Sequence, residues 1–206
     1  MALSRTINGA LRRVPVWPIY IVGAMPAFWY LYLGLTGGLG AEPIKGLEHA
    51  LGLFGLKLLI VVLSVTPLRK ATGISLIRFR RALGLLVFFY IACHLATWLI
   101  LDVQNVDAIW KDIVKRPYIT IGMVAFTLML PLAVTSNNLS VRKIGPVLWR
   151  RVHWLTYPVA MLGAVHYVML VKGWQIEPLV YLTIVVALLM MRLVAFGQLR
   201  VAFPKA

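Results

Sequence analysis

The sequence predicts an all-α integral membrane protein, a bundle of six transmembrane helices with both termini in the cytoplasm. Three observations support this fold class. Hydrophobic residues make up 61% of the 206 residues, whereas a soluble domain is about half apolar. The apolar residues form continuous segments instead of alternating with polar ones, which excludes the strands of a membrane barrel. Finally, the charged residues divide unevenly between the two sides of such a bundle.

Each apolar segment is long enough to cross a bilayer core, which takes about 20 helical residues. The segments cover residues 17–35, 47–66, 82–101, 119–136, 152–171 and 179–196. Between them lie stretches rich in residues that end helices, such as TGGLGAEP, TPLRKATG, SNNLS and KGWQIEP. We expect residues 1–206 to form one transmembrane domain. We expect no cleaved signal peptide, because the basic start is not followed by a small-residue cleavage site.

The distribution of charge predicts how the bundle is oriented. Alternating loops place fifteen basic residues and no acid on one side: Arg5, Arg12, Arg13, Arg69, Lys70, Arg78, Arg80, Arg81, Arg142, Lys143, Arg150, Arg151, Arg192, Arg200 and Lys205. The other side holds every acid: Glu42, Glu48, Asp102, Asp107, Asp112 and Glu177, with Lys45, Lys111, Lys115, Arg116 and Lys172. By the positive-inside rule, the first side is cytoplasmic. The net charge of +15 therefore indicates topology and contact with membrane lipid, and we expect no nucleic-acid partner.

Cysteine usage limits the redox chemistry of the chain. Cys93 is the only cysteine, which excludes an intramolecular disulfide, a thiolate-bound iron–sulfur cluster and covalent attachment of heme. Any heme must therefore be held non-covalently.

Two histidines lie at the same predicted depth in the membrane. His94 follows Arg81 by thirteen residues and His166 follows Arg151 by fifteen, each in a segment that runs outward. At 1.5 Å per residue, both imidazoles lie roughly 20 Å from the cytoplasmic edge. Two axial ligands of one heme b need equal depth, and histidine is a common ligand of heme iron. A buried pair of hydrogen-bonded histidines that packs helices together explains the same pattern, so both interpretations stay open.

A second candidate site lies at the cytoplasmic end. His153 lies about 20 Å below His166 on the same segment, but the third segment offers Arg80 and Arg81 at that depth and no histidine. Arginine does not bind iron, although it binds phosphates and propionates well. With Arg78, these residues suggest an anion site, or a second heme with His153 as one ligand. Basic residues at an inner helix end also serve as ordinary topology determinants.

Two further ionisable residues are weaker candidates for cofactor binding. Lys57 lies near the middle of the second segment, so we expect it to face the bundle interior, toward a heme propionate, a quinone or a proton path. A lysine that reaches a neighbouring carbonyl is the alternative. His49 begins the same segment beside Glu48, either as a ligand or as a residue of the rim.

Several motifs follow one another over nearly the whole chain: LTGGLGAEPIKGLEHALG, VTPLRKATG, IRFRRALGLLVFFYIACHLATW, KRPYITIGM, TSNN and LWRRVHWLTYPVAMLGAVHY. Together with six spans and the placement of His94, they resemble the ferric-reductase-like transmembrane family. Within that family, the chain is most similar to the heme-binding membrane subunits of protein-methionine-sulfoxide reductase systems.

This resemblance implies a multi-pass protein of the bacterial inner membrane that carries heme b and flavin mononucleotide (FMN). Electrons would come from the quinone pool or a cytosolic flavin reductase and pass to a periplasmic molybdopterin reductase of methionine sulfoxide. His94 and His166 would be the heme ligands, and Arg80, Arg81 and His153 would lie near the flavin phosphate. Arg80 stands where NADPH oxidases have an inner histidine, which favours one heme and one flavin.

Two other functions are compatible with the same residues. One is a quinone-linked cytochrome b subunit of another oxidoreductase, and the other is a non-redox, proton-coupled membrane protein. The redox hypotheses predict that the purified protein is coloured, and the non-redox hypothesis predicts that it is colourless. In the favoured reading we expect substrate reduction in the partner subunit, since the short outer loops cannot form a catalytic domain.

Overall fold

The computed structural model describes residues 2–171, 173 and 175–202. Two of the lysines used to predict topology, Lys172 and Lys205, lie outside the described residues. All regular elements in the described part of the chain are helical, as predicted.

The α-helices are α1 (Ala2–Arg13), α2 (Trp17–Leu35), α3 (Pro43–Thr72), α4 (Arg80–Ala96), α5 (Val106–Lys115), α6 (Pro117–Val134), α7 (Asn138–Val152), α8 (Thr156–Leu170) and α9 (Ile176–Ala202). Three shorter helical elements adjoin them. Two are 3-10 turns, η1 (Ile77–Phe79) and η3 (His153–Leu155), and the third is a π-helical stretch, η2 (Thr97–Val103), that continues α4.

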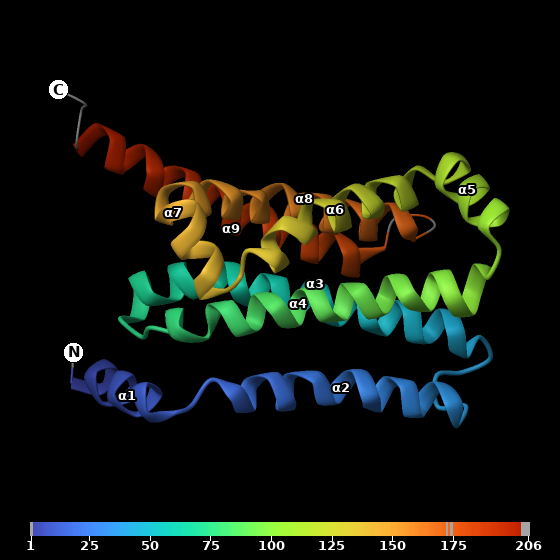
Figure 1. Ribbon diagram of the computed structural model, residues 1–206, viewed down its shortest axis with the longest axis horizontal. Coiled ribbons are helices and arrows are strands. Elements are labelled where there is room, and N and C mark those ends of the chain that lie inside the picture. Colours follow the sequence, from blue (N-terminus) through green and yellow to red (C-terminus); the bar gives the residue numbers. More distant parts are fainter. Residues whose placement is uncertain (1, 172, 174, 203–206) are drawn as a thin grey trace.

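The long helices pack as a layered bundle (Figure 1). Helix α2 forms one layer, α3 and α4 form the middle layer, and α6, α8 and α9 form the third. Helices α1 and α7 and the last turns of α9 lie at one end, whereas α5 lies at the other (Figure 1). We call these the inner end and the outer end.

Four helical stretches among the described residues are long and apolar enough to cross a membrane: Trp17–Leu35, Pro43–Thr72, Ile77–Val103 and Pro117–Val134. They coincide with the first four predicted segments. The predicted fifth segment begins in the last residue of α7, passes through η3 and continues as α8, which has 15 residues. Helix α9 covers the predicted sixth segment. The full count of six spans, and the side on which the termini lie, stay predictions.

Local chemistry explains where these helices begin and end. Pro43 occupies the first turn of α3, where a missing N–H costs nothing, and Gly73 ends that helix with a φ of 75°. At the start of α8, Pro158 has no N–H to donate to the carbonyl of Trp154, four residues earlier. The chain takes a 3-10 turn at that point.

Three helices were not predicted from the sequence. Helices α1 and α5, and all of α7 except Val152, lie outside the predicted transmembrane segments. The SNNLS motif is in fact a helix start, because the Asn137 side chain accepts a hydrogen bond from the backbone N–H of Ser140 at 2.7 Å. Asn105 caps α5 in the same manner, through the N–H of Asp107. Asparagine is a strong N-cap residue, so it begins helices as readily as it interrupts them.

An apolar layer crosses the middle of the bundle. Buried side chains from α3, α4, α6, α8 and α9 form it: Leu59, Val62, Leu63, Val87, Met129, Val159, Ala160, Ala164 and Val185. Four of these, Leu59, Val87, Met129 and Val159, line cavities on both sides. The layer therefore separates an outer cavity from an inner one.

Candidate functional site

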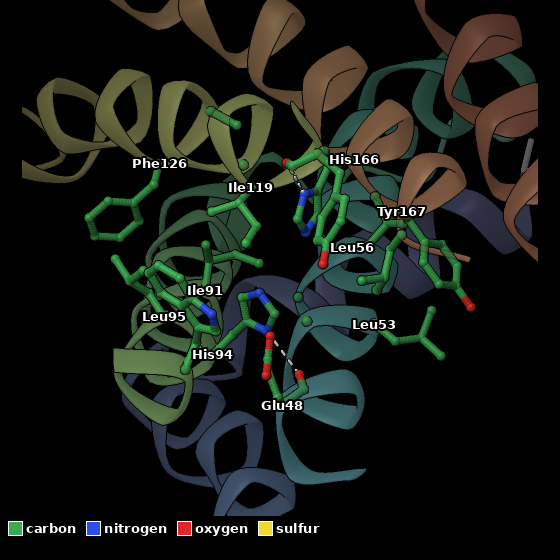
Figure 2. A pocket seen from close by; sticks show the side chains of 18 of the residues that line it. Glu48, Leu53, Leu56, Ile91, His94, Leu95, Ile119, Phe126, His166 and Tyr167 are labelled. Atoms are coloured by element: carbon green, nitrogen blue, oxygen red, sulfur yellow. Dashed lines mark hydrogen bonds between the residues drawn. The ribbon is translucent and has the colours of Figure 1, made fainter. Parts of the chain in front are cut away.

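The outer cavity lies between α3, α4, α6 and α8 and has a volume of about 370 Å³, within the range of cofactor pockets. Figure 2 shows His94 and His166 projecting into it from opposite walls, with Ile91, Leu95 and Phe126 around them. Most of the lining is apolar, which keeps water away from the two imidazoles.

The two imidazoles lie next to each other. Their ring centroids are 6.2 Å apart and the ring planes meet at 80°. His94 Nδ1 lies 2.8 Å from the carbonyl oxygen of Glu48, and His166 Nδ1 lies 2.7 Å from that of Tyr118. A carbonyl oxygen only accepts, so each Nδ1 carries the proton and donates it. Each Nε2 is therefore left with a free lone pair, the form in which histidine binds a metal.

Polar side chains lie around the outer part of this cavity. His49 is exposed on its wall, with its ring 5.5 Å from that of Tyr167. Lys45 and Arg116 also line it. Lys45 forms an ion pair with Glu42, and Arg116 forms one with Asp112. His49 thus lines the outer cavity with an exposed side chain.

The inner cavity is larger, with a volume of about 920 Å³. Its described lining residues include seven basic side chains, one histidine and no acid: Lys70, Arg78, Arg80, Arg81, Arg150, Arg151, Arg192 and His153. The structure therefore brings together all four residues that the sequence assigned to an inner site. Such a concentration of positive charge suits an anionic ligand.

His153 sits in the 3-10 turn η3 and is tied down on two sides. Its ring stacks on Trp149, with centroids 3.9 Å apart, and its Nδ1–H donates to the carbonyl of Trp149 at 3.0 Å. Its Nε2 lies 3.4 Å from Ser136 Oγ. Among the described residues that line the inner cavity, His153 is the only histidine, so a second imidazole for a bis-histidine heme does not face it there.

The arginines at this site have individual contacts. Arg81 Nη1 donates to Asn138 Oδ1 at 2.7 Å, and Arg78 Nη1 donates to the carbonyl of Arg12. These bonds attach the start of α4 to α7, and η1 to α1. Arg78 and Arg81 thus help to close the inner end of the cavity, and Arg80 is partly buried on its wall.

Arg192 is a residue of the inner cavity that the sequence analysis treated only as a topology determinant. It is 8% exposed, its Nη2 donates to the carbonyl of Leu63 at 3.0 Å, and its Nη1 donates to Tyr157 Oη at 3.1 Å. A signal was present, because residue 192 lies inside the predicted sixth span and an ionisable residue within a span is a functional candidate.

The expectation that Lys57 faces the bundle interior is wrong. Lys57 is exposed and lines neither the outer nor the inner cavity. The buried residues of α3 nearest to it are Gly55, Leu56 and Leu59. Each residue of a helix turns by about 100°, so position 57 points away from the face that these three define.

Comparison with known proteins gives a consistent family assignment. Residues 49–164, more than half of the chain, match the family described as "Ferric reductase like transmembrane component". A relative from Brucella anthropi, named "Protein-methionine-sulfoxide reductase heme-binding subunit MsrQ", is 52% identical over 180 residues, which are 87% of this chain and 81% of the relative. Relatives of the same name from Brucella ovis and Brucella canis are 52% identical over 179 residues, 86% of this chain and 81% of each relative. The chain therefore belongs to the MsrQ family, within the ferric-reductase-like transmembrane proteins.

Proposed function

We propose that this chain is the membrane electron-transfer subunit of a protein-methionine-sulfoxide reductase system. It takes electrons from the quinone pool or a cytosolic flavin reductase, and passes them through FMN and heme b to the periplasmic molybdopterin reductase MsrP. MsrP then reduces methionine sulfoxide in oxidised periplasmic proteins. The observation that carries this proposal is the pair His94 and His166, whose free Nε2 atoms share one apolar cavity.

The geometry of the pair fits the two axial ligands of one heme. Imidazoles that bind one metal from opposite sides, with metal–nitrogen bonds of about 2 Å, place their ring centroids about 6 Å apart. The observed separation is 6.2 Å. A ligating histidine also commonly donates its other ring N–H to a backbone carbonyl, and both rings do so. A pair that only packed helices together would have no need for two free Nε2 atoms in a cavity.

The residues of the outer cavity have distinct roles in this proposal. His94 and His166 would hold the iron of a non-covalent heme b, which would supply reversible one-electron transfer. The carbonyls of Glu48 and Tyr118 keep the protons on Nδ1 and fix the rings. Apolar side chains exclude water, which sets the dielectric around the site. His49 lies at the rim and binds no iron.

The inner cavity is proposed to hold FMN. A phosphate monoester carries about two negative charges near neutral pH, and the described residues of the lining include seven cations and no acid. Arg80 and Arg81 are the arginines that the family resemblance places near that phosphate, and the Trp149–His153 stack lines the same cavity from α7 and η3. The apolar layer of buried side chains would lie between the two cofactors.

The orientation completes the proposal. With the cationic inner end in the cytoplasm, as the positive-inside rule requires, FMN faces the cytoplasmic donor and the histidine pair lies nearer the periplasm. The acids of the chain, among them Glu42, Asp102 and Asp112, are then on the periplasmic face, where they would steer MsrP. In this proposal the protein lies in the bacterial inner membrane and crosses it six times.

The first test is a dithionite-reduced-minus-oxidised spectrum of the purified protein, with heme and flavin measured per chain. We expect a b-type spectrum that is lost in His94→Ala and in His166→Ala and retained in His49→Ala, a control from the rim of the same cavity. We expect His153→Ala and Arg80→Ala to keep the heme and lose most of the flavin, with Lys57→Ala as the exposed control.

Each opposite result would count against a stated part of the proposal. A colourless wild type, after heme supplementation, would contradict the electron-transfer function and favour a non-redox membrane protein. Two hemes per chain, one of which is lost in His153→Ala, would contradict FMN at the inner cavity. A normal spectrum with no transfer of electrons to MsrP would favour a cytochrome b subunit of another oxidoreductase.

A further inference from the structure

His94 lies in a notch on α3 that a glycine creates. Its ring donates from Nδ1 to the carbonyl of Glu48 at 2.8 Å, and Gly52 follows Glu48 by four residues. A Cβ at position 52 would lie 3.0 Å from His94 Nδ1 and 3.2 Å from Cε1, closer than ordinary van der Waals contact. Residues four apart share one helix face, so the ring occupies the space between a carbonyl and a bare Cα.

His166 lies in an equivalent notch on α6. Its Nδ1–H donates to the carbonyl of Tyr118 at 2.7 Å, and Gly122 follows Tyr118 by four residues. A Cβ at position 122 would lie 3.0 Å from both Nδ1 and Cε1 of His166. The α3–α4 pair and the α6–α8 pair thus hold their histidines with the same arrangement of carbonyl, glycine and imidazole.

The close approach of the ring explains why glycine stands at both positions. Both lie inside α-helices, where glycine destabilises the helix relative to alanine. Neither has a positive φ that would require glycine. Gly9 on α1 differs, since nothing lies within 4 Å of its Cβ position and it lines neither cavity.

We propose that Gly52 and Gly122 are positioning residues for the heme ligands. They let each imidazole lie against a carbonyl, and they fix the two ring planes at the near-perpendicular angle of 80°. The inference rests on the proposed function, because it assumes that His94 and His166 bind the iron of one heme. It adds two residues that determine the electronic properties of that iron.

Two physical consequences follow from the notches. A hydrogen bond from Nδ1–H to a carbonyl makes the imidazole a stronger donor, which stabilises ferric iron and lowers the reduction potential. A methyl group in the notch pushes the ring away from the carbonyl and weakens that bond.

The angle between the rings has a second consequence. Perpendicular imidazoles interact with different d orbitals of the iron and leave these orbitals close in energy. The ferric low-spin electron paramagnetic resonance (EPR) signal is then strongly anisotropic.

The first experiment needs no variant. The ferric EPR spectrum of the wild-type holoprotein should show one strongly anisotropic low-spin signal. A rhombic signal of the kind given by parallel imidazoles, in a protein whose heme is lost in His94→Ala and in His166→Ala, would overturn this inference and leave the proposed function intact. A wild type without heme would overturn both.

The second experiment compares Gly52→Ala and Gly122→Ala with the control Gly9→Ala. We expect both notch variants to bind heme with a more positive midpoint potential and a less anisotropic EPR signal, while Gly9→Ala matches wild type. Loss of heme from a notch variant that keeps the helical circular dichroism and elution volume of wild type also supports the role. Unchanged potential and EPR signal in both variants, or an equal shift in Gly9→Ala, overturns it. If both notch variants fail to fold, the wild-type EPR spectrum decides.

Discussion

At the scale of single residues, the Arg192 side chain replaces a backbone hydrogen bond that is missing at Pro67 in α3. Residue 67 would normally donate its N–H to the carbonyl of Leu63, but Pro67 inside α3 has none. Arg192 Nη2 donates to that carbonyl at 3.0 Å, and Nη1 donates to Tyr157 Oη on α8. One buried guanidinium therefore joins α9 to α3 and α8 at the wall of the inner cavity.

We predict that Arg192→Leu lowers the melting temperature of the detergent-solubilised protein. The change leaves the buried Leu63 carbonyl without a donor, which costs about 1–3 kcal/mol. Pro67→Ala restores an N–H for that carbonyl, so it should stabilise the Arg192→Leu protein by more than it stabilises wild type. A double-mutant cycle of melting temperatures checks this coupling. Additive effects of the two substitutions would show that the arginine and the proline are independent.

At the scale of elements, α5 is a surface helix that lies between the third and fourth predicted spans. Val106, Trp110 and Val114 recur every fourth residue on one face and are 80%, 68% and 65% exposed. The neighbouring Ile109 and Ile113 are partly buried, and Lys111 and Lys115 lie on the opposite face. The helix lies at the outer end of the bundle (Figure 1). An amphipathic helix of this kind lies in the plane of the membrane interface.

We predict that the apolar face of α5 enters the bilayer interface. Nitroxide labels at Val114→Cys and at Lys111→Cys, each in a Cys93→Ser background, would report on the two faces in lipid vesicles. The label at 114 should be more accessible to oxygen than to a water-soluble nickel complex, and the label at 111 should show the reverse. Equal accessibility at both positions would place α5 in water, away from the lipid.

At the scale of the whole molecule, the charged side chains and the two cavities are arranged between the inner and the outer end of the bundle. The basic residues that line the inner cavity lie at the end marked by α1 and α7, and the exposed ion pairs Lys45–Glu42 and Arg116–Asp112 lie at the other. The apolar layer between them includes Leu63 and Val185, both 0% exposed. The arrangement separates a cavity lined by basic side chains from the cavity that contains His94 and His166 within one bundle.

We predict that the loop after α3 is cytoplasmic and that the loop after η2 is periplasmic, because the basic residues flank the former. Alkaline phosphatase fused after Gln104 should be active, since it folds only when exported, and a fusion after Ser75 should be inactive. Fluorescent-protein fusions at the same two positions should give the opposite pattern and serve as the control. Activity at residue 75 and none at residue 104 would invert the proposed orientation.

The sequence by itself determined the helical class, the first four spans, the equal depth of His94 and His166, and the cluster of Arg78, Arg80, Arg81 and His153. These follow from hydropathy, helix rise and charge, which are properties of the chain read in one dimension. The starts of helices were harder to predict from the sequence, because asparagine is common both at helix N-caps and in loops.

Only the tertiary structure decided which way side chains point around each helix. It placed Lys57 outside the bundle, Arg192 inside it, and each imidazole against a glycine on another helix. Depth along a helix is fixed by counting residues, whereas direction around it depends on which neighbours pack against each face. The contacts of His94 with Glu48 and of His166 with Tyr118 join residues 46 and 48 positions apart. The physical reason lies in packing between helices, which no single segment specifies.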